Sequence, residues 1–153
     1  MHELRWLQLP KDELDDFLGD GGTGILSFST PGDEPPITVP VSYGYFADAE
    51  RFYFRLAITD ESEKASVVDR PVSFVTFEET DEGWKSVVAT GYLEEVDELP
   101  YESAVVQGLW AVQMPRVDIF ERPRDEVPFV DFCLDPDNLT GRTEIVAHGR
   151  DGE

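Results

Sequence analysis

The chain has 153 residues, 33 of them acidic and 12 basic, which gives a formal net charge of −21 at pH 7. This length fits one domain with a full-sized hydrophobic core, so we expect a single domain over residues 1–153. The charge argues against nucleic acid and membrane surfaces as partners, because both bind clustered lysine and arginine side chains, and no apolar run approaches the about 20 residues that cross a bilayer.

The first predicted elements are one helix and three strands. Residues 10–19 (PKDELDDFLG) begin with proline at a first helical position and end at glycine, which predicts a short amphipathic helix. β-Branched and aromatic residues then dominate three segments that are separated by turn clusters, which predicts antiparallel strands. These strands cover residues 24–30, 37–46 and 51–57.

The second half of the chain alternates helical and strand patterns in the same way. A short helix is expected to stop before Arg70-Pro71, and the turn TDEG joins two apolar segments into a hairpin. Short strands joined mainly by tight turns, with few and peripheral helices, predict a mainly β fold: a split antiparallel barrel of six or seven strands. The remaining predicted elements are a helix at 60–69, hairpin strands at 71–79 and 84–96, a helix at 99–114, and strands at 128–134 and 140–148.

The strand RFYFRLA carries a cation among strictly alternating residues. Phe52, Phe54 and Leu56 share one face, so Arg55 is expected to point away from the apolar core. Read alone, such an arginine is typical of a solvent-facing ion pair with a nearby acid.

The segment that follows, TDESEKAS, predicts a helix start with Thr59 or Asp60 as the N-cap. Exposed N–H groups at a helix start bind phosphate, and Ser62 and Lys64 would add a hydroxyl and a charge. An ordinary surface pair between Asp60 and Lys64 explains the same residues. Because the helix follows the strand at once, however, Arg55 and Lys64 come to one place, and together they predict a phosphate-sized anion site.

Other familiar site motifs are missing from the sequence. The stretch GDGGTG (19–24) lacks the lysine-serine ending of a P-loop and precedes a strand, so it is interpreted as a helix stop and a strand entry. Cys133 is the single cysteine, so no disulfide within the chain is predicted. His2 and His148 lie near opposite ends, so neither a metal site nor a serine–histidine nucleophile is predicted.

The ends and the charge balance suggest where the protein works. The sequence MHELRWLQLPKDEL has no basic region followed by an apolar stretch, so it is not interpreted as a secretory signal and we expect a cytoplasmic protein. Few lysines and many carboxylates resemble halophilic proteins from cells that hold molar salt. At about 1 M salt the Debye length is about 3 Å, so self-repulsion is screened there, and we expect the fold to weaken at low ionic strength.

The order of five segments between Gly24 and Val96 is informative. They are GILSF, PVSYGY, FYFRLA, SEK and WKSVVATGYLEEV. Their order and spacing resemble the flavin-binding split-barrel family related to pyridoxamine 5′-phosphate oxidase, especially its smaller nitroimidazole-resistance-like branch. TGR (140–142) is similar to the closing segment of that family.

This resemblance implies an FMN-binding split barrel that forms a homodimer, with FMN in the cleft between the two barrels. The isoalloxazine ring would be lined, partly through backbone groups, by Val41, Ser42 and Tyr43. The ribityl chain and phosphate would be surrounded by Arg55, Leu56, Ala57, Ser62 and Lys64. The residues that would approach the flavin, from the same or the partner subunit, are Trp84 and Ser86. Ordinary barrel or dimer packing is the alternative role of Trp84 and Tyr43.

The resemblance further implies an FMN-dependent oxidoreductase with a small-molecule substrate, in which flavin N5 takes or gives a hydride. Tyr43 and Ser42 are the nearest candidates for a general acid or base, and both could be purely structural. Arg55-Leu56-Ala57 stands where the small branch often has His-x-Ala. The arginine-led strand of true pyridoxamine phosphate oxidases is replaced by Pro40-Val41-Ser42-Tyr43, which argues against vitamin B6 oxidation.

Three alternatives stay open at this point. A deazaflavin could occupy the same cleft, since relatives of this fold are known to use it. The protein could be a non-catalytic dimer that holds FMN for storage or sensing. It could also be a cofactor-free dimer in which Arg55 and Lys64 pair with Asp60 and Glu63.

Overall fold

The computed structural model describes residues 3–58, 61–96, 99–100, 103–111 and 129–147. None of the helices in these ranges has the length and apolarity that crossing a bilayer requires. In chain order the elements are β1 (Glu3–Gln8), α1 (Lys11–Leu18), β2 (Gly21–Phe28), β3 (Ile37–Phe46), the short 3₁₀ helix η1 (Ala47–Ala49), β4 (Arg51–Ala57), α2 (Glu61–Val68), β5 (Pro71–Thr80), β6 (Gly83–Glu95), α3 (Ala104–Ala111), β7 (Phe129–Leu134) and β8 (Asn138–Ala147).

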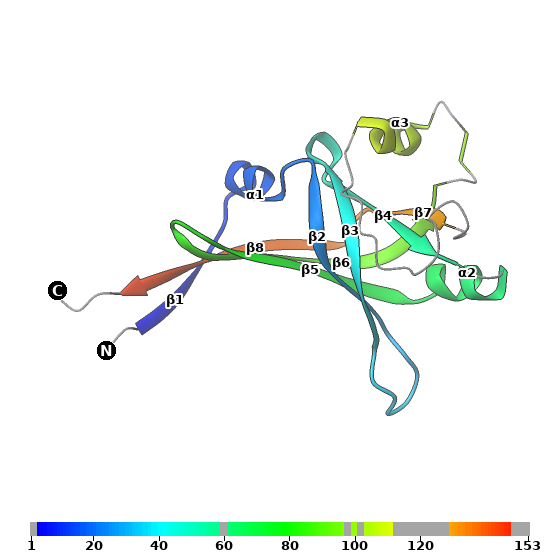
Figure 1. Ribbon diagram of the computed structural model, residues 1–153, viewed down its shortest axis with the longest axis horizontal. Helices are drawn as coiled ribbons and strands as arrows, with labels where there is room; N and C mark the ends of the chain where they lie inside the picture. The colour runs from blue at the N-terminus through cyan, green and yellow to red at the C-terminus, as the bar shows by residue number, and fades with distance from the viewer. Residues whose placement is uncertain (1–2, 59–60, 97–98, 101–102, 112–128, 148–153) are drawn as a thin grey trace, which may run out of the picture.

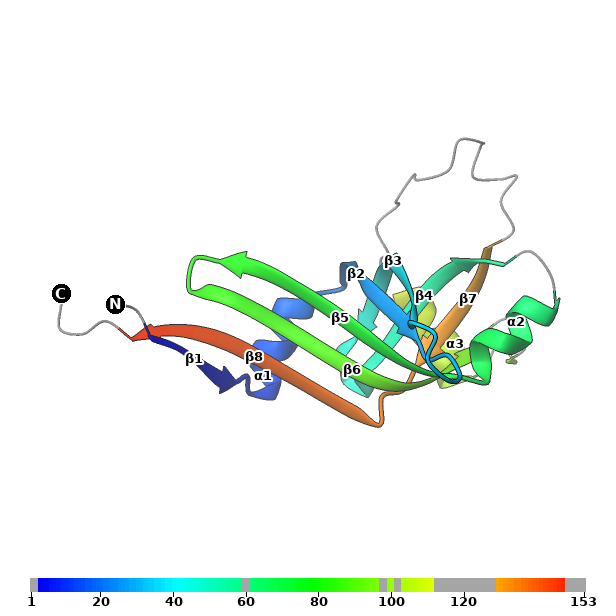
Figure 2. The same cartoon turned by 90° about the horizontal axis from the view of Figure 1, so that it is seen from below.

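The strands of the described ranges form one antiparallel sheet that closes on itself. Their order is β1-β8-β6-β5-β2-β3-β4-β7, and β6 also pairs with β7. This second pairing joins the two ends of the run from β6 to β7, so these strands make a barrel. β8 and β1 continue from β6 as an arm, which Figures 1 and 2 show running alongside the far end of the β5–β6 hairpin. The predicted mainly β, antiparallel split barrel with few helices is confirmed.

Local signals set most of the element ends. β3 and β4 begin and end where predicted, and α1 lies between Pro10 and Gly19, whose φ is 60°. GDGGTG contains the expected helix stop and strand entry, with β2 beginning at Gly21. β1 has no counterpart among the predicted strands, and it pairs with β8 along its whole length. Of the predicted helix 99–114, α3 is the described helical part, and residues 101–102 and 112–114 lie outside the described residues.

The core of the barrel is aromatic. Phe52 and Phe54 are fully buried, as the alternation in β4 predicts. Phe74 of β5 packs against both rings, with centroid separations of 5.4 and 5.0 Å. Leu14 and Leu18 belong to the same cluster, so the apolar face of α1 packs onto the barrel.

A second, smaller core lies on the outer side of β4 and β7. The alternation places Tyr53 on the face opposite to the barrel core, yet Tyr53 is fully buried because it packs with residues of α3. Its hydroxyl donates a hydrogen bond to the carbonyl of Val105 at 2.5 Å. Cys133, its register partner in β7, is buried beside it, and burial raises the pKa of the Cys133 thiol to about 12. The face of β4 that carries Arg55 is therefore partly covered, with Arg55 on its exposed part.

Candidate functional site

β3 and β4 pair over a short ladder and then separate. The last pair of this ladder is Tyr43 with Phe54. Beyond it, β3 continues along β2, whereas β4 continues along β7. Figure 1 shows the β2–β3 hairpin projecting from the barrel while β4 runs toward α2. We call the diverging stretches, residues 37–42 of β3 and 55–57 of β4, the β3–β4 split.

The split brings together residues that the family resemblance implies for one ligand. It contains two residues predicted to line the flavin ring, Val41 and Ser42, and Tyr43 forms the closing pair of the ladder. The three strand residues predicted near the ribityl chain and phosphate lie on its opposite side. Residues 41–43 of β3 and 55–57 of β4, which lie on either side of η1 in the sequence, are therefore close to the same split.

Arg55 lies at this split and pairs with an acid across the β4–β7 ladder. Its Nε donates to Oδ1 of Asp131 at 2.8 Å and its Nη2 to Oδ2 at 3.3 Å. The two residues are direct register partners, and the Arg55 side chain is 43% exposed against 17% for Asp131. The expected outward direction of Arg55 is confirmed, and Asp131 is not among the acids predicted to pair with it. The alternation of Phe129, Asp131 and Cys133 in FVDFCL carries the signal that could have found it.

Helix α2 begins shortly after β4 ends. β4 finishes at Ala57 and α2 starts at Glu61, so the first turn of the helix follows Arg55 closely along the chain. The predicted helix over residues 60–69 is confirmed in its position. Ser62 and Lys64 lie in its first turns, and their side chains are outside the described part of the structure. Their role at a phosphate group stays a prediction.

Three predicted site residues turn their side chains into the barrel. Val41, Tyr43 and Leu56 are buried members of the core. The Tyr43 hydroxyl donates to the carbonyl of Leu18 at 3.0 Å, and burial raises the pKa of Tyr43 to about 12. The Tyr43 phenol therefore stays protonated near neutral pH with its proton engaged inside the protein. These residues can meet a ligand at the split through their backbone groups, whereas Ser42 is half-buried on the outward side.

The outward side chains of five neighbouring strands lie in rows, because the strands are in register. We call this surface the outward face. Its central row is mainly apolar and comprises Pro40, Ile25, Val75, Val88 and Thr140. The row on one side is polar and comprises Thr38, Ser27, Ser73, Thr90 and Asn138. The row on the other side is mixed and contains the register partners Ser42–Thr23 and Phe77–Ser86–Arg142.

Trp84 and Ser86 lie on this face but far from Arg55 of the same chain. In the strand order, β5, β2 and β3 stand between β6 and β4. The other route is also long, because Trp84 lies nine positions before Leu93, where β6 meets β7, and about 3.3 Å per residue makes this about 30 Å. The Trp84 ring is 38% exposed and lies 6.0 Å from Phe77. Within one chain, β5 and β2 therefore lie between Ser86 and the β3 side of the split, and β3 also lies between Ser86 and Arg55.

Comparisons with known proteins agree with this architecture. The family model described as pyridoxamine 5′-phosphate oxidase matches residues 10–143. Comparison with curated protein sequences gave no match.

Solved structures are similar over nearly the whole chain. A candidate pyridoxamine 5′-phosphate oxidase from Corynebacterium glutamicum has 19% identity and a TM-score of 0.64, covering 94% of this chain and 100% of its own. An FAD-binding protein from Mesorhizobium loti has 23% identity and a TM-score of 0.60, covering 94% and 98%. A candidate 5-nitroimidazole antibiotic resistance protein from Bacteroides thetaiotaomicron has 9% identity and a TM-score of 0.60, covering 97% and 95%. At these identities the three structures establish the fold that is shared.

The family model covers most of the 153 residues, including the strands that form the split. The resemblance that the five segments between Gly24 and Val96 indicate is confirmed. The chain belongs to the pyridoxamine 5′-phosphate oxidase family.

Proposed function

We propose that this protein is an FMN-dependent oxidoreductase that binds its flavin at the β3–β4 split and acts on a small molecule. The observation that carries the proposal is the position of Arg55 at the split, with the start of α2 following directly after β4. Membership of the family supports a flavin, as does the description of the Mesorhizobium loti relative as FAD-binding.

The phosphate of FMN would be held by Arg55, Lys64, the Ser62 hydroxyl and the first N–H groups of α2. A half-exposed ion pair such as Arg55–Asp131 contributes only about 0–1 kcal/mol, whereas a hydrogen bond to a charged group contributes about 1.5–3 kcal/mol. A phosphate can therefore compete for Arg55. Carboxylates beyond about 8 Å are screened at physiological salt, so the net charge of −21 does not forbid an anion here.

The isoalloxazine ring would lie along β3 at Val41, Ser42 and Tyr43. Val41 and Tyr43 turn inward, so they would contribute backbone groups, and Ser42 could add its hydroxyl. The ladder to β4 ends with the pair Tyr43–Phe54, which leaves Val41 and Ser42 without β4 as their neighbour. These β3 residues would contact the isoalloxazine ring, whereas Arg55 would contact the phosphate.

We further propose a homodimer that forms through the central and mixed rows of the outward face, with the polar row at its solvent-accessible rim. An apolar centre with polar margins is the usual anatomy of a protein interface. Phe77 is 59% exposed, and Trp84 and Val88 are each 38% exposed, so large apolar side chains gather on one surface. A twofold axis through this face would bring Trp84 and Ser86 of the partner subunit to the split. Within one chain, β5 and β2 separate these two residues from β3.

The chemistry would divide between cofactor and protein. A bound flavin supplies hydride transfer at N5, and the protein supplies binding, orientation and exclusion of water. The Tyr43 hydroxyl donates its hydrogen bond to the Leu18 carbonyl, so we do not expect it to act as a general acid. Ser42 is then the nearer candidate for a contact with the reacting atoms, and no residue is assigned as catalytic.

Identification of the copurifying cofactor is the first test. The protein should be purified in molar potassium chloride, and the released small molecule identified by absorbance and mass. We expect FMN in about one copy per chain. Release of FAD or a deazaflavin would make that molecule the proposed cofactor in place of FMN. A colourless protein that binds none of the three flavins would contradict the proposed function.

The site itself is tested by the double variant Arg55→Ala/Lys64→Ala. We expect it to lose FMN at least tenfold more readily, because two charged hydrogen bonds are removed. The control is Lys11→Ala, which removes a cation that pairs with Asp15 on α1, away from the split. Dimer mass should be unchanged in both. Equal FMN retention by the parent protein, the double variant and the Lys11→Ala control would refute the phosphate site.

Turnover separates an enzyme from a storage protein. Addition of NADH or NADPH to the flavin-loaded dimer, followed by an added acceptor, should bleach and then restore the flavin absorbance. Stable absorbance with both donors, in a protein that retains FMN, would favour the non-catalytic flavin-binding dimer.

A further inference from the structure

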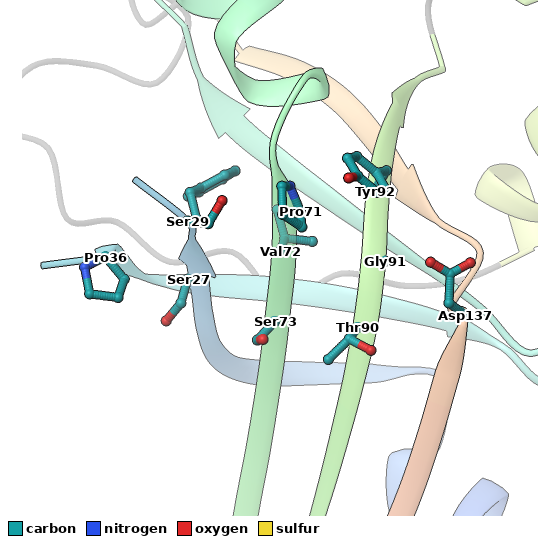
Figure 3. A pocket seen from close by; sticks show the side chains of 11 residues that line it. Ser27, Ser29, Pro36, Pro71, Val72, Ser73, Thr90, Gly91, Tyr92 and Asp137 are labelled. Carbon is teal, nitrogen blue, oxygen red and sulfur yellow. The ribbon is translucent and has the colours of Figure 1, made fainter. Parts of the chain in front are cut away.

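A groove of about 330 Å³ lies at the end of the β5–β6 hairpin opposite to its turn. Figure 3 shows its walls, which come from the end of β2, the start of β5, the end of β6 and the turn before β8. Hydroxyl side chains from three adjacent strands, Ser27, Ser73 and Thr90, are in register along it. This volume is at the small end of ligand pockets and suits a molecule of one or two rings. We call it the Tyr92–Asp137 groove.

One wall of the groove is apolar and aromatic. Tyr92 is 54% exposed and is the direct register partner of Pro71. In Figure 3 the two rings stand beside each other on β6 and β5. An exposed tyrosine face attracts flat rings and cations. This wall therefore offers a stacking surface to a planar ligand.

The charge of the groove comes from Asp137, the one ionised side chain among its described lining residues. The backbone N–H of Asp137 donates to the carbonyl of Thr90 at 2.8 Å, which holds this residue against β6. The absent side chain of Gly91 permits the approach, because a Cβ there would lie 3.3 Å from the Asp137 nitrogen. Arg70, the nearby cation, has its Nη1 3.4 Å from the carbonyl of Ser29 and does not line the groove.

The hydroxyl groups add polar contacts that are available to a ligand. Within the described residues, the Ser73 and Thr90 hydroxyls have no hydrogen-bond partner, whereas the Ser27 hydroxyl lies 3.2 Å from that of Thr38. Hydroxyls accept as well as donate, so they suit an ammonium or amide N–H. An anion would instead meet the Asp137 carboxylate in a protein of net charge −21.

We propose that the Tyr92–Asp137 groove binds a small aromatic amine, with its ring against Tyr92 and Pro71 and its ammonium group toward Asp137. The groove shares no lining residue with the set that would hold the flavin. The inference therefore does not depend on FMN, and its failure would leave the flavin proposal intact.

The test compares three probes with one ring system and different charges. Tryptamine is cationic at pH 7, indole is neutral and indole-3-acetate is anionic. Titration calorimetry on the protein as purified should give the tightest binding for tryptamine, about two- to fivefold weaker binding for indole, and the weakest for indole-3-acetate. Equal or tighter binding of indole-3-acetate, or no binding of any probe, would overturn the proposal.

Two substitutions locate the probe and divide its contacts. Asp137→Asn keeps the backbone bond to Thr90 and should bring tryptamine to the affinity of indole, while indole itself is unchanged. Tyr92→Ala should weaken tryptamine and indole alike, by about three- to tenfold. Tyr92→Leu keeps apolar volume and serves as the second variant if the alanine form folds poorly, because loss of the aromatic face should still weaken both tryptamine and indole.

The matched control is Asp81→Asn, which removes an exposed carboxylate in the turn at the other end of the β5–β6 hairpin. It should bind all three probes as the parent protein does, and a thermal melt should confirm that each variant is folded. Tryptamine affinity that is unchanged in both Asp137→Asn and the Tyr92 variants would place the probe elsewhere and overturn the proposal.

Discussion

Arg55 and Asp131 lie opposite each other on β4 and β7, although they are 76 positions apart in the sequence. The pair is bidentate but half-exposed, so it is a weak interaction that a stronger anion can displace. Under the proposed function, this balance would let one arginine serve the structure without a ligand and hold the phosphate when FMN is bound. The alternation of residues within β4 predicts that Arg55 points outward, but it does not identify Asp131 as the acid that pairs with it.

At the residue scale, the variant Asp131→Asn tests whether Arg55 reaches the flavin phosphate. Loss of the competing carboxylate should tighten FMN binding by about two- to fivefold, since exposed pairs are worth about 0.2–1 kcal/mol. Fluorescence titration with FMN measures the change. The control Asp135→Asn removes the acid whose Oδ2 lies 3.9 Å from Arg51 Nη2 and should leave FMN affinity unchanged. Unchanged or weaker binding in Asp131→Asn would contradict a contact between Arg55 and the phosphate.

At the element scale, β2 packs closely against β5. A Cβ on Gly24 would lie 2.6 Å from both the Phe74 ring and the carbonyl oxygen of Val75. The carbonyl belongs to the backbone and cannot rotate away, so glycine is required where β2 enters the barrel. The glycine-led pattern GILSF indicates a strand, whereas the reason for the glycine lies in the neighbouring strand.

Gly24→Ala should therefore lower the free energy of unfolding by about 1–3 kcal/mol, the usual cost of overpacking. Denaturation in urea at constant high salt measures it. Thr23→Ala on the exposed side of the same strand should change stability by less than about 0.5 kcal/mol. Equal effects of the two substitutions would show that the close approach does not constrain β2.

The elements were predictable to different degrees. β3, β4 and α2 follow from turn signals and alternation, because those are properties of neighbouring residues. β1 and the smaller core around Tyr53 were not predictable in this way. A strand that exists by pairing with β8, and a tyrosine covered by α3, depend on contacts between distant segments.

At the scale of the whole molecule, the charge of −21 surrounds an apolar barrel. Mutual repulsion of exposed carboxylates opposes compactness and is reduced when salt shortens the Debye length. The aromatic core acts in the opposite sense at any salt concentration. The balance of these two terms should make the stability of the protein depend on ionic strength.

The melting temperature should rise as potassium chloride increases from dilute buffer to about 2 M, by about 2–4 °C for each 1 kcal/mol of repulsion that is screened. Thermal melts followed by circular dichroism measure this. Sucrose at matched osmolality is the control, since it does not screen charge and separates exclusion effects from screening. A melting temperature that does not increase with salt would contradict the halophilic interpretation.

The amino-acid sequence by itself determined the strands around the split, the outward direction of Arg55, the helix after β4 and the likeness to the family. These follow from periodicity, turn residues and the order of segments along the chain. Tertiary structure alone decided that β6 closes the barrel through β7, that Asp131 is the partner of Arg55, and that hydroxyl side chains from three strands line one groove. The physical reason is register: which residues face each other across a sheet depends on pairing between distant strands, and local periodicity carries no record of it.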